Sequence, residues 1–209
     1  MSKYLYSNEY IIYYPGTEIP INKKFIKNPS ILQVYDKALL LKSYYLFNKY
    51  LTKKTIFDEK YFRQLHYDTF QKLYKFAGEY RSQDVSKGDT VFCKAKYIQE
   101  FLIDLFNKFK ADNYLKNYNN KPLDEFAEKI AYYMGELIAI HPFWEFNGRT
   151  TRLFFDMIAV SNGYNYIDYT KFKYDGEENS FIQASIECVQ LGNNTMLKEI
   201  IKQGLCKRG

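Results

Sequence analysis

The sequence predicts an all-α protein that carries one small β-hairpin. Apolar residues recur at intervals of three or four along most of the chain, which is the spacing of helices that bury one face. One internal segment, 82–93, breaks that rhythm with a Lys-Gly-Asp turn between two valines, a pattern typical of a short hairpin. Linkers rich in Gly, Pro or Ser and internal repeats are absent from the sequence, so we expect a single domain over residues 1–209.

Seven helices are expected, and the segments 1–28 and 113–121 are expected to be irregular. The first helix should begin at Pro29, because Asn28 is a good N-cap and proline suits the first helical position. Lys42 interrupts the apolar stripe of this helix. Pro142 should end the fourth, largely apolar helix, since proline disfavours helical geometry in the residue before it. The expected helices cover approximately residues 29–46, 57–76 (ended by Gly78), 97–109, 122–141, 149–162, 177–191 and 194–205.

The composition is that of a globular protein with a core built from aromatic rings. Apolar residues make up 46% of the 209 residues and aromatic residues 19%. The net charge of +6 is compatible with a nucleic acid, an anionic ligand or a solubilising surface, and the scattered lysines favour the last. Three widely separated cysteines indicate a reducing compartment, and we expect a cytoplasmic protein because neither a signal peptide nor a membrane-spanning stretch is visible.

Residues with catalytic potential concentrate in the segment His-Pro-Phe-Trp-Glu-Phe-Asn-Gly-Arg-Thr-Thr-Arg, residues 141–152. This segment joins two apolar helices and leads into a helix N-terminus, where free N–H groups and the helix dipole favour anions. Asn147 and Gly148 tolerate left-handed backbone angles and would let the loop curl around an anion. Arg149 and Arg152 lie three residues apart and would grip phosphate oxygens together.

Two further side chains complete a plausible site for phosphoryl or nucleotidyl transfer. Glu145 offers a hard oxygen ligand, and Mg²⁺ needs only one or two protein carboxylates when phosphates and water supply the rest. His141 is a candidate general base, because the unperturbed pKa of a histidine suits proton transfer near neutral pH. Each residue alone has an ordinary structural explanation, such as a cap, a turn or a surface charge. Their occurrence together within twelve residues favours the catalytic interpretation.

This segment resembles the signature of the Fic (filamentation-induced-by-cAMP) family, His-x-Phe-x-Asp/Glu-Gly-Asn-Gly-Arg-x-x-Arg. The sequence matches every specified position except one, where Phe146 replaces a glycine. If that position needs a positive φ, the phenylalanine is strained by ~1–3 kcal/mol. The segments Tyr13–Thr17 and Ala77–Arg81 are also similar to family segments. About residues 10–205 can be laid on the family's helical bundle.

The resemblance implies a protein adenylyltransferase, of the type found as stand-alone bacterial proteins, that uses Mg-ATP to place AMP on a Tyr, Ser or Thr hydroxyl of a cytosolic target. His141 would deprotonate the hydroxyl, and Glu145 would hold Mg²⁺. The backbone from Phe146 to Arg149, which includes Asn147 and Gly148, would cradle phosphates. Arg149 and Arg152 would bind their outer end. The hairpin would be a flap that pins the target by strand addition, through Ser86, Lys87, Gly88, Asp89, Thr90, Val91 and Phe92.

Other functions stay open on the sequence alone. A kinase-like branch of the family carries lysine where this chain has Gly148, which favours AMP transfer. A catalytically impaired interaction protein would be compatible with Phe146, and a basic helical DNA-binding module would leave Glu145 and His141 unexplained.

The family's inhibitory helix carries the pattern Ser/Thr-x-x-x-Glu-Gly/Asn. Thr195 and Glu199 keep that pattern but Ile200 breaks it, so we expect an ordinary closing helix and a separate small inhibitor protein. His66, the only other histidine, is expected to be structural.

Overall fold

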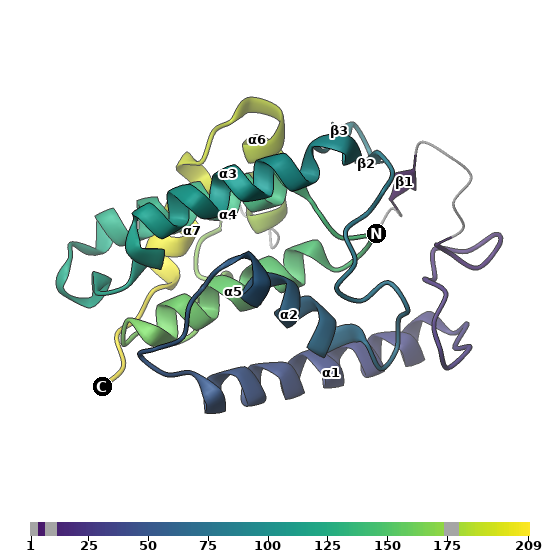
Figure 1. Cartoon of the computed structure of the whole chain (residues 1–209), viewed down its shortest axis with the longest axis horizontal. Coiled ribbons are helices and arrows are strands. Elements are labelled where there is room, and N and C mark those ends of the chain that lie inside the picture. The colour runs from purple at the N-terminus through teal and green to yellow at the C-terminus, as the bar shows by residue number, and fades with distance from the viewer. Residues whose placement is uncertain (1–3, 7–11, 174–179) are drawn as a thin grey trace.

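A computed structural model of the chain describes residues 4–6, 12–173 and 180–209. Within these residues, seven α-helices surround a core and a small antiparallel sheet lies at one end (Figure 1). The helices are α1 (Pro29–Tyr50), α2 (Glu59–Phe70), α3 (Ile98–Ala111), α4 (Leu123–Ile140), α5 (Asn147–Ser161), α6 (Ser180–Leu191) and α7 (Thr195–Gly204). The strands are β1 (Leu5–Tyr6), β2 (Val85–Lys87) and β3 (Thr90–Val91), and short 3-10 turns occupy Ala95–Tyr97, Asn113–Leu115 and Tyr118–Asn120. The predicted helical class with a small hairpin is confirmed.

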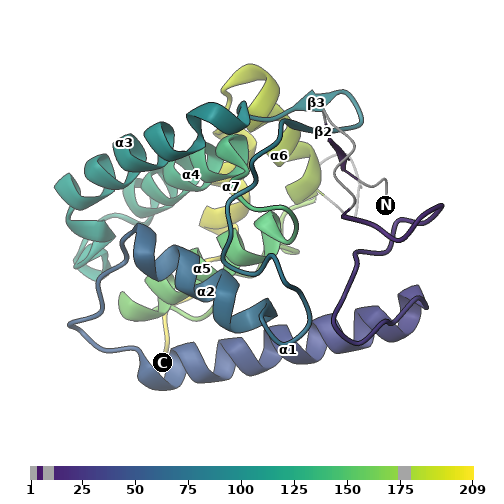
Figure 2. The same cartoon turned by 45° about the vertical axis from the view of Figure 1, so that its right-hand side comes forward.

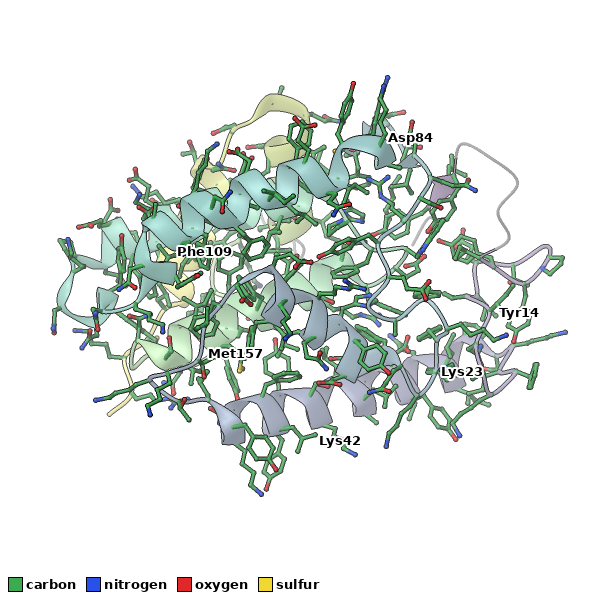
Figure 3. All side chains as sticks on the ribbon, viewed as in Figure 1. Tyr14, Lys23, Lys42, Asp84, Phe109 and Met157 are labelled. Atoms are coloured by element: carbon green, nitrogen blue, oxygen red, sulfur yellow. The ribbon has the colours of Figure 1, made fainter. Side chains whose placement is uncertain are left out.

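Helix α1 begins where the sequence predicts. The side-chain oxygen of Asn28 accepts hydrogen bonds from the N–H groups of Ser30 and Ile31 at 3.0 and 3.1 Å. The helix runs along one side of the molecule in both views (Figures 1 and 2) and buries few side chains. Lys42 points away from the fold (Figure 3), which explains its place in an otherwise apolar stripe.

Helix α2 ends at Phe70, six residues before the predicted end. Leu73 and Tyr74 are buried at 1% and 0% exposure, but they lie in turns that fold back beside the helix. Because they are buried, the apolar pattern continues past the last helical residue. The pattern alone cannot distinguish a buried helical residue from a buried residue in a turn. Gly78 adopts a φ of +76° in these turns, where an added Cβ would lie 2.9 Å from the Cβ of Tyr67.

Helices α4 and α5 form the centre of the fold. Helix α4 packs against α3, α5, α6 and α7, so it is buried around most of its circumference, as predicted. In Figure 3, Phe109 of α3 and Met157 of α5 point into this core. Apolar as α4 is, no helix in the described part of the chain is long and apolar enough to cross a membrane.

A second, smaller apolar cluster packs the N-terminal segment against α1 and the turns after α2. The loop between α4 and α5 contributes to both clusters, with Phe143 in the first and Trp144 in the second. This double anchoring fixes the loop that carries the predicted site. The start of the sixth predicted helix, at 177, lies outside the described residues.

The predicted hairpin is present and has gained a third strand. Strands β2 and β3 turn at Gly88, whose φ is +55°. Strand β1 pairs antiparallel with β2, with Leu5 opposite Ser86 and Tyr6 opposite Val85. The expectation that residues 1–28 are irregular is therefore wrong at 5–6. A two-residue strand carries no repeating pattern of its own and forms only because a distant edge pairs with it.

Candidate active site

His141 is the residue at which α4 ends. Its N–H donates to the carbonyl of Leu137 at 3.1 Å, and its φ of +49° leaves the helix before Pro142. The ring Nδ1 lies 3.3 Å from the carbonyl oxygen of Ile138. Because a carbonyl only accepts, Nδ1 carries the proton and Nε2 keeps its lone pair. His141 therefore presents Nε2 as an acceptor, the form that a general base requires.

The surroundings of His141 keep it neutral. Only 6% of the residue is exposed, and its ring stacks on Phe92 of the flap at 3.8 Å between centroids. Burial, together with the positive charges of Arg81 and Lys87, lowers the pKa of His141 to about 3. The imidazole is thus uncharged, and able to take a proton, throughout the physiological pH range.

Arg81 fastens the flap to the end of α4, a role that sequence reasoning missed. Its guanidinium group is buried and donates to the carbonyls of His141 at 2.8 Å and Ile140 at 3.1 Å. The same group donates to the carbonyls of Gln83 at 2.6 Å and Cys93 at 2.5 Å, on the two sides of the hairpin. Arg81 therefore sets the flap at a fixed place beside the catalytic candidate.

The loop after His141 is closed by the side chain of Asn147. Its Oδ1 accepts from the N–H of Phe143, and its Nδ2 donates to the carbonyl of the same residue, both at 2.8 Å. Neither Asn147 nor Gly148 has a positive φ; both belong to the first turn of α5. The expectation that they curl the loop in left-handed geometry is wrong, because Asn147 acts through its side chain.

Phe146 supplies the left-handed residue instead. Its φ is +63°, so a phenylalanine holds the conformation that the family pattern gives to glycine. The ring stacks on Phe70 at 4.2 Å and packs on Tyr74 at 4.8 Å, in the smaller apolar cluster. This packing offsets the backbone strain and directs the ring toward Phe70 and Tyr74.

His66 holds the loop from beneath. Its Nδ1 accepts from the N–H of Gly78 at 2.8 Å, so its Nε2 carries the proton and donates to the carbonyl of Glu145 at 3.0 Å. The ring stacks on Phe143 at 3.9 Å. Burial lowers the pKa of His66 to about 3. The expected structural role is confirmed, and its specific task is to position the backbone of the metal-ligand candidate.

Glu145 places one carboxylate beside the start of α5. The hydroxyl of Tyr13 donates to its Oε1, and burial raises the pKa of the carboxyl group to about 7. The described residues contain no group of three or more metal-ligating side chains. A single hard oxygen fits Mg²⁺ that arrives with a nucleotide, since phosphates and water then complete the shell.

The N-terminus of α5 has open backbone donors and open space. The first hydrogen bond of the helix runs from the N–H of Thr150 to the carbonyl of Phe146 at 3.0 Å. The N–H groups of Asn147, Gly148 and Arg149 therefore lie outside the helical ladder. An added Cβ at Gly148 would meet no atom within 4 Å in the described part of the chain. These features suit a phosphate group.

Arg149 and Arg152 lie on different neighbours. Arg149 is 3.3 Å from the carboxylate of Asp36 in α1. Arg152 lies over the rings of Tyr169 and Phe181, 5.8 and 5.3 Å from their centroids. The two cations thus have different partners in this structure, and the expectation that they grip phosphate oxygens together stays a prediction.

Two buried carboxylates, Asp36 and Asp156, support the residues around the site. They were not identified in the sequence, because each lies in an apolar stretch of a helix. Asp36 also accepts a hydrogen bond from Tyr74 at 2.9 Å, and burial raises its pKa. Asp156 accepts from the hydroxyl of Tyr44 at 2.5 Å and the N–H of Ile167 at 2.9 Å. Burial raises the pKa of Asp156 to about 6.

The predicted flap lies against the site. Phe92 stacks on His141, and Lys87 lies over the ring of Tyr4 at 4.9 Å. On the other strand of the hairpin, Thr90 is buried and its Oγ1 is 3.4 Å from the Gln190 amide of α6. The hairpin therefore has one edge against α6 and the other edge along β1.

The closing helix is ordinary in its packing. Helix α7 begins at Thr195 and packs on α4, with Ile200 fully buried between them. Glu199 is half-buried and lies near Lys202. Among the residues that the structure describes, Glu199 forms no ion pair with Arg152, which lies over Tyr169 and Phe181.

Known proteins resemble this chain in sequence and in fold. Residues 56–159 match the model of the Fic/DOC family. The chain is 31% identical over 173 residues to "Probable protein adenylyltransferase y4lH" of Sinorhizobium fredii, covering 83% of this chain and 84% of that protein. It is 30% identical over 192 residues to "Protein adenylyltransferase VbhT" of Bartonella schoenbuchensis, covering 91% of this chain but 38% of VbhT, so it spans well under half of that longer relative.

A solved structure agrees with the sequence comparisons. The N-terminal Fic domain of a VirB-translocated Bep effector protein of Bartonella quintana, with bound ADP, superposes with a TM-score of 0.77 at 25% identity. The match covers 94% of this chain and 95% of that one. The signature loop, the helical bundle around it and these likenesses agree, and the chain belongs to the Fic/DOC family.

Proposed function

We propose that this chain is a protein adenylyltransferase, which transfers AMP from ATP to a hydroxyl group of a target protein. The observation that carries the proposal is a neutral, buried His141 whose Nε2 accepts a hydrogen bond from a tyrosine hydroxyl, next to the open N-terminus of α5. The names of the relatives y4lH and VbhT support the same activity. The ADP bound to the Bartonella quintana domain supports a nucleotide at this site.

The phosphates of ATP would lie at the N-terminus of α5. The backbone N–H groups of Asn147, Gly148 and Arg149, which lie outside the helical ladder, would face them, and the side chains of Arg149 and Arg152 would supply positive charge nearby. Bound Mg²⁺, held by Glu145, would neutralise part of the phosphate charge. Glu145 has to be ionised to bind the metal. The hydrogen bond that it accepts from the hydroxyl of Tyr13 would also have to break.

The reaction needs one proton transfer and one displacement. A target hydroxyl would donate its proton to Nε2 of His141, and its oxygen would bond to the α-phosphorus while pyrophosphate leaves. The proton on Nδ1, fixed by the carbonyl of Ile138, keeps Nε2 available throughout. A positioned base of this kind is worth ~10²–10⁴ in rate.

The environment of Phe146 supports an active enzyme over a catalytically impaired one. The loop reaches left-handed geometry at this position without glycine, and the ring packs on Phe70 and Tyr74. The space beside Gly148, in the first turn of α5, is also open. Glycine at this position, where the kinase-like branch has lysine, favours transfer of AMP over transfer of the γ-phosphate.

The target would dock at the flap. Strand addition uses backbone hydrogen bonds and asks little of the target sequence, and β2 offers the edge that β1 now occupies. Residues Ser86 to Phe92 would make up this docking surface. The free thiols of Cys93, Cys188 and Cys206 fit a target in a reducing cytosol. Glu199 forms no ion pair with Arg152 in the described part of the chain, which favours control by a separate inhibitor protein.

Transfer of labelled ATP tests the proposal. The purified chain is incubated with Mg²⁺, a bacterial lysate and ATP labelled at either the α- or the γ-phosphate. We expect protein-bound label from α-labelled ATP alone. Label from γ-labelled ATP would indicate a kinase-like reaction, and no label from either would reject group transfer to protein.

A further inference from the structure

Strand β1 places a tyrosine of this chain at its own site. Leu5 and Tyr6 pair with β2, and Tyr4 is the residue that precedes the strand. In Figures 1 and 2, β1 lies beside β2 at the end of the molecule where α5 begins. The N-terminal segment thus occupies the flap edge on which an acceptor segment would dock.

The hydroxyl of Tyr4 lies 2.9 Å from Nε2 of His141. Since Nδ1 carries the imidazole proton, the hydroxyl donates and Nε2 accepts, the direction in which a base removes a proton. The rings of Tyr4 and His141 meet edge to face at 5.1 Å between centroids, and Nζ of Lys87 lies 4.9 Å from the centroid of the Tyr4 ring. The phenol oxygen is therefore held by geometry.

Resting on the proposed adenylyltransferase activity, we propose that Tyr4 is an acceptor of AMP within its own chain. Its hydroxyl proton moves to Nε2 of His141, and its oxygen forms a bond to the α-phosphorus of ATP. The bond from that phosphorus to the bridging oxygen breaks, and pyrophosphate leaves with the electron pair. The product is a phosphodiester between Tyr4 and AMP, and the proton passes from His141 to solvent.

Electrostatics around Tyr4 agree with this role. Burial and the charge of Glu145 raise the pKa of the Tyr4 phenol, and Arg149 opposes them. A phenol of raised pKa keeps its proton at neutral pH and needs a base to become a nucleophile. The two charges that act on the Tyr4 phenol are thus those of the proposed metal ligand and of a proposed phosphate-binding residue.

The neighbouring tyrosines are matched controls. The hydroxyl of Tyr6, in the same strand, donates to the carbonyl of Trp144 at 2.5 Å. The hydroxyl of Tyr13 donates to the carboxylate of Glu145. In the part of the chain that the structure describes, the hydroxyl bonded to Nε2 of His141 is that of Tyr4, so an acceptor chosen by the base should be Tyr4 rather than Tyr6 or Tyr13.

The main experiment maps the modification. Wild type, Tyr4→Phe and Tyr6→Phe are each incubated with Mg²⁺ and α-labelled ATP, with and without lysate, and tryptic peptides are sequenced by mass spectrometry. We expect the AMP mass on Tyr4 in wild type and Tyr6→Phe, and at least a tenfold loss of self-label in Tyr4→Phe. Label on another residue, or on lysate proteins without self-label, overturns the inference while the proposed function stands. No label on any protein rejects both.

A mixing experiment tests transfer within one chain. His141→Ala, which keeps Tyr4, is mixed with Tyr4→Phe, which keeps the base. Modification within one chain predicts no AMP on Tyr4 of the His141→Ala protein. Label there means that one molecule modifies another, and it overturns the intramolecular assignment.

A measurement without nucleotide tests the contact itself. The sequence has 2 histidines, so the ¹⁵N resonances of His141 are assignable by comparison with His66. Tyr4→Phe removes the donor to Nε2 and should shift that resonance, whereas Tyr6→Phe should leave it in place. Equal spectra for wild type and Tyr4→Phe would show that the phenol is not held at the base.

Discussion

Phe146 shows how one side chain stabilises a conformation that its own backbone disfavours. A left-handed φ costs an L-residue ~1–2 kcal/mol, and the packing of the Phe146 ring on Phe70 and Tyr74 offsets that cost. Phe146→Ala removes this ring packing but keeps the backbone strain. Phe146→Gly removes both the ring packing and the strain.

We expect both variants to be less stable than wild type, with Phe146→Gly more stable than Phe146→Ala by about 1 kcal/mol. Chemical denaturation monitored by circular dichroism measures the difference. Equal stability of the two variants would show that the backbone is not strained at this position.

Asp156 should make stability depend on pH. Burial raises its pKa from an ordinary value of about 3.9 to about 6, so between these values the folded state holds a proton that the unfolded state has lost. The contribution of Asp156 to the free energy of unfolding is fully present below pH ~4 and is lost as the pH rises through 6. The loss is at most about 3 kcal/mol.

Asp156→Asn removes this titration while an amide can still accept from Ile167 and donate to Tyr44. We expect the stability of wild type relative to this variant to fall between pH 4 and 7. Unfolding free energies at several pH values measure this. The other titrating groups cancel in the difference, so a constant difference would contradict the raised pKa.

The sequence predicts the residues of the loop better than the residues that hold it. His141, Glu145 and Arg149 are recognisable because their types and spacing match a chemistry. His66, Arg81 and Asp36 act through contacts with residues 79, 60 and 113 positions away along the chain. No local pattern encodes such pairs, and buried polar side chains on apolar faces are the only visible sign.

At the scale of elements, we expect helix α7 to stabilise the fold without inhibiting the transfer activity of the site. Glu199 lies near Lys202, while Arg152 rests on Tyr169 and Phe181. Glu199→Ala should change the transfer rate by less than about twofold, as surface substitutions usually cost within ~0.5 kcal/mol. Labelling of lysate proteins measures the rate.

A gain of about tenfold or more in Glu199→Ala would correspond to the release of a charged contact of ~1.5–3 kcal/mol. That outcome would make α7 an inhibitory helix. Lys202→Ala is the matched control, because it alters the same surface of the helix without removing the carboxylate.

The sequence predicts a helix correctly where its buried apolar residues all lie within the helix. It misplaces a helix end where buried residues continue beyond the helix. The start of α1 follows from its cap, and the end of α4 from Pro142. The end of α2 was placed too late because Leu73 and Tyr74 are buried outside the helix. Strand β1 exists only through its pairing with β2.

At the scale of the whole molecule, the site joins the two apolar clusters through the loop between α4 and α5. A nucleotide bound at this loop should therefore stabilise the entire fold. At a ligand concentration of 100 Kd the gain is ~2.7 kcal/mol, which raises Tm by several degrees. Mg-ADP should raise the Tm of wild type and raise that of Arg149→Ala less. No shift in wild type would contradict a nucleotide site.

The central claim is that His141 is the base at a nucleotide-binding loop, and His141→Ala tests it most directly. Transfer of AMP from α-labelled ATP and the Kd for Mg-ADP are measured on the same preparations of wild type and variant. The account predicts a transfer rate at least ~10²-fold lower and a nucleotide affinity within a few fold of wild type. An unchanged transfer rate in a variant that still binds nucleotide would contradict it.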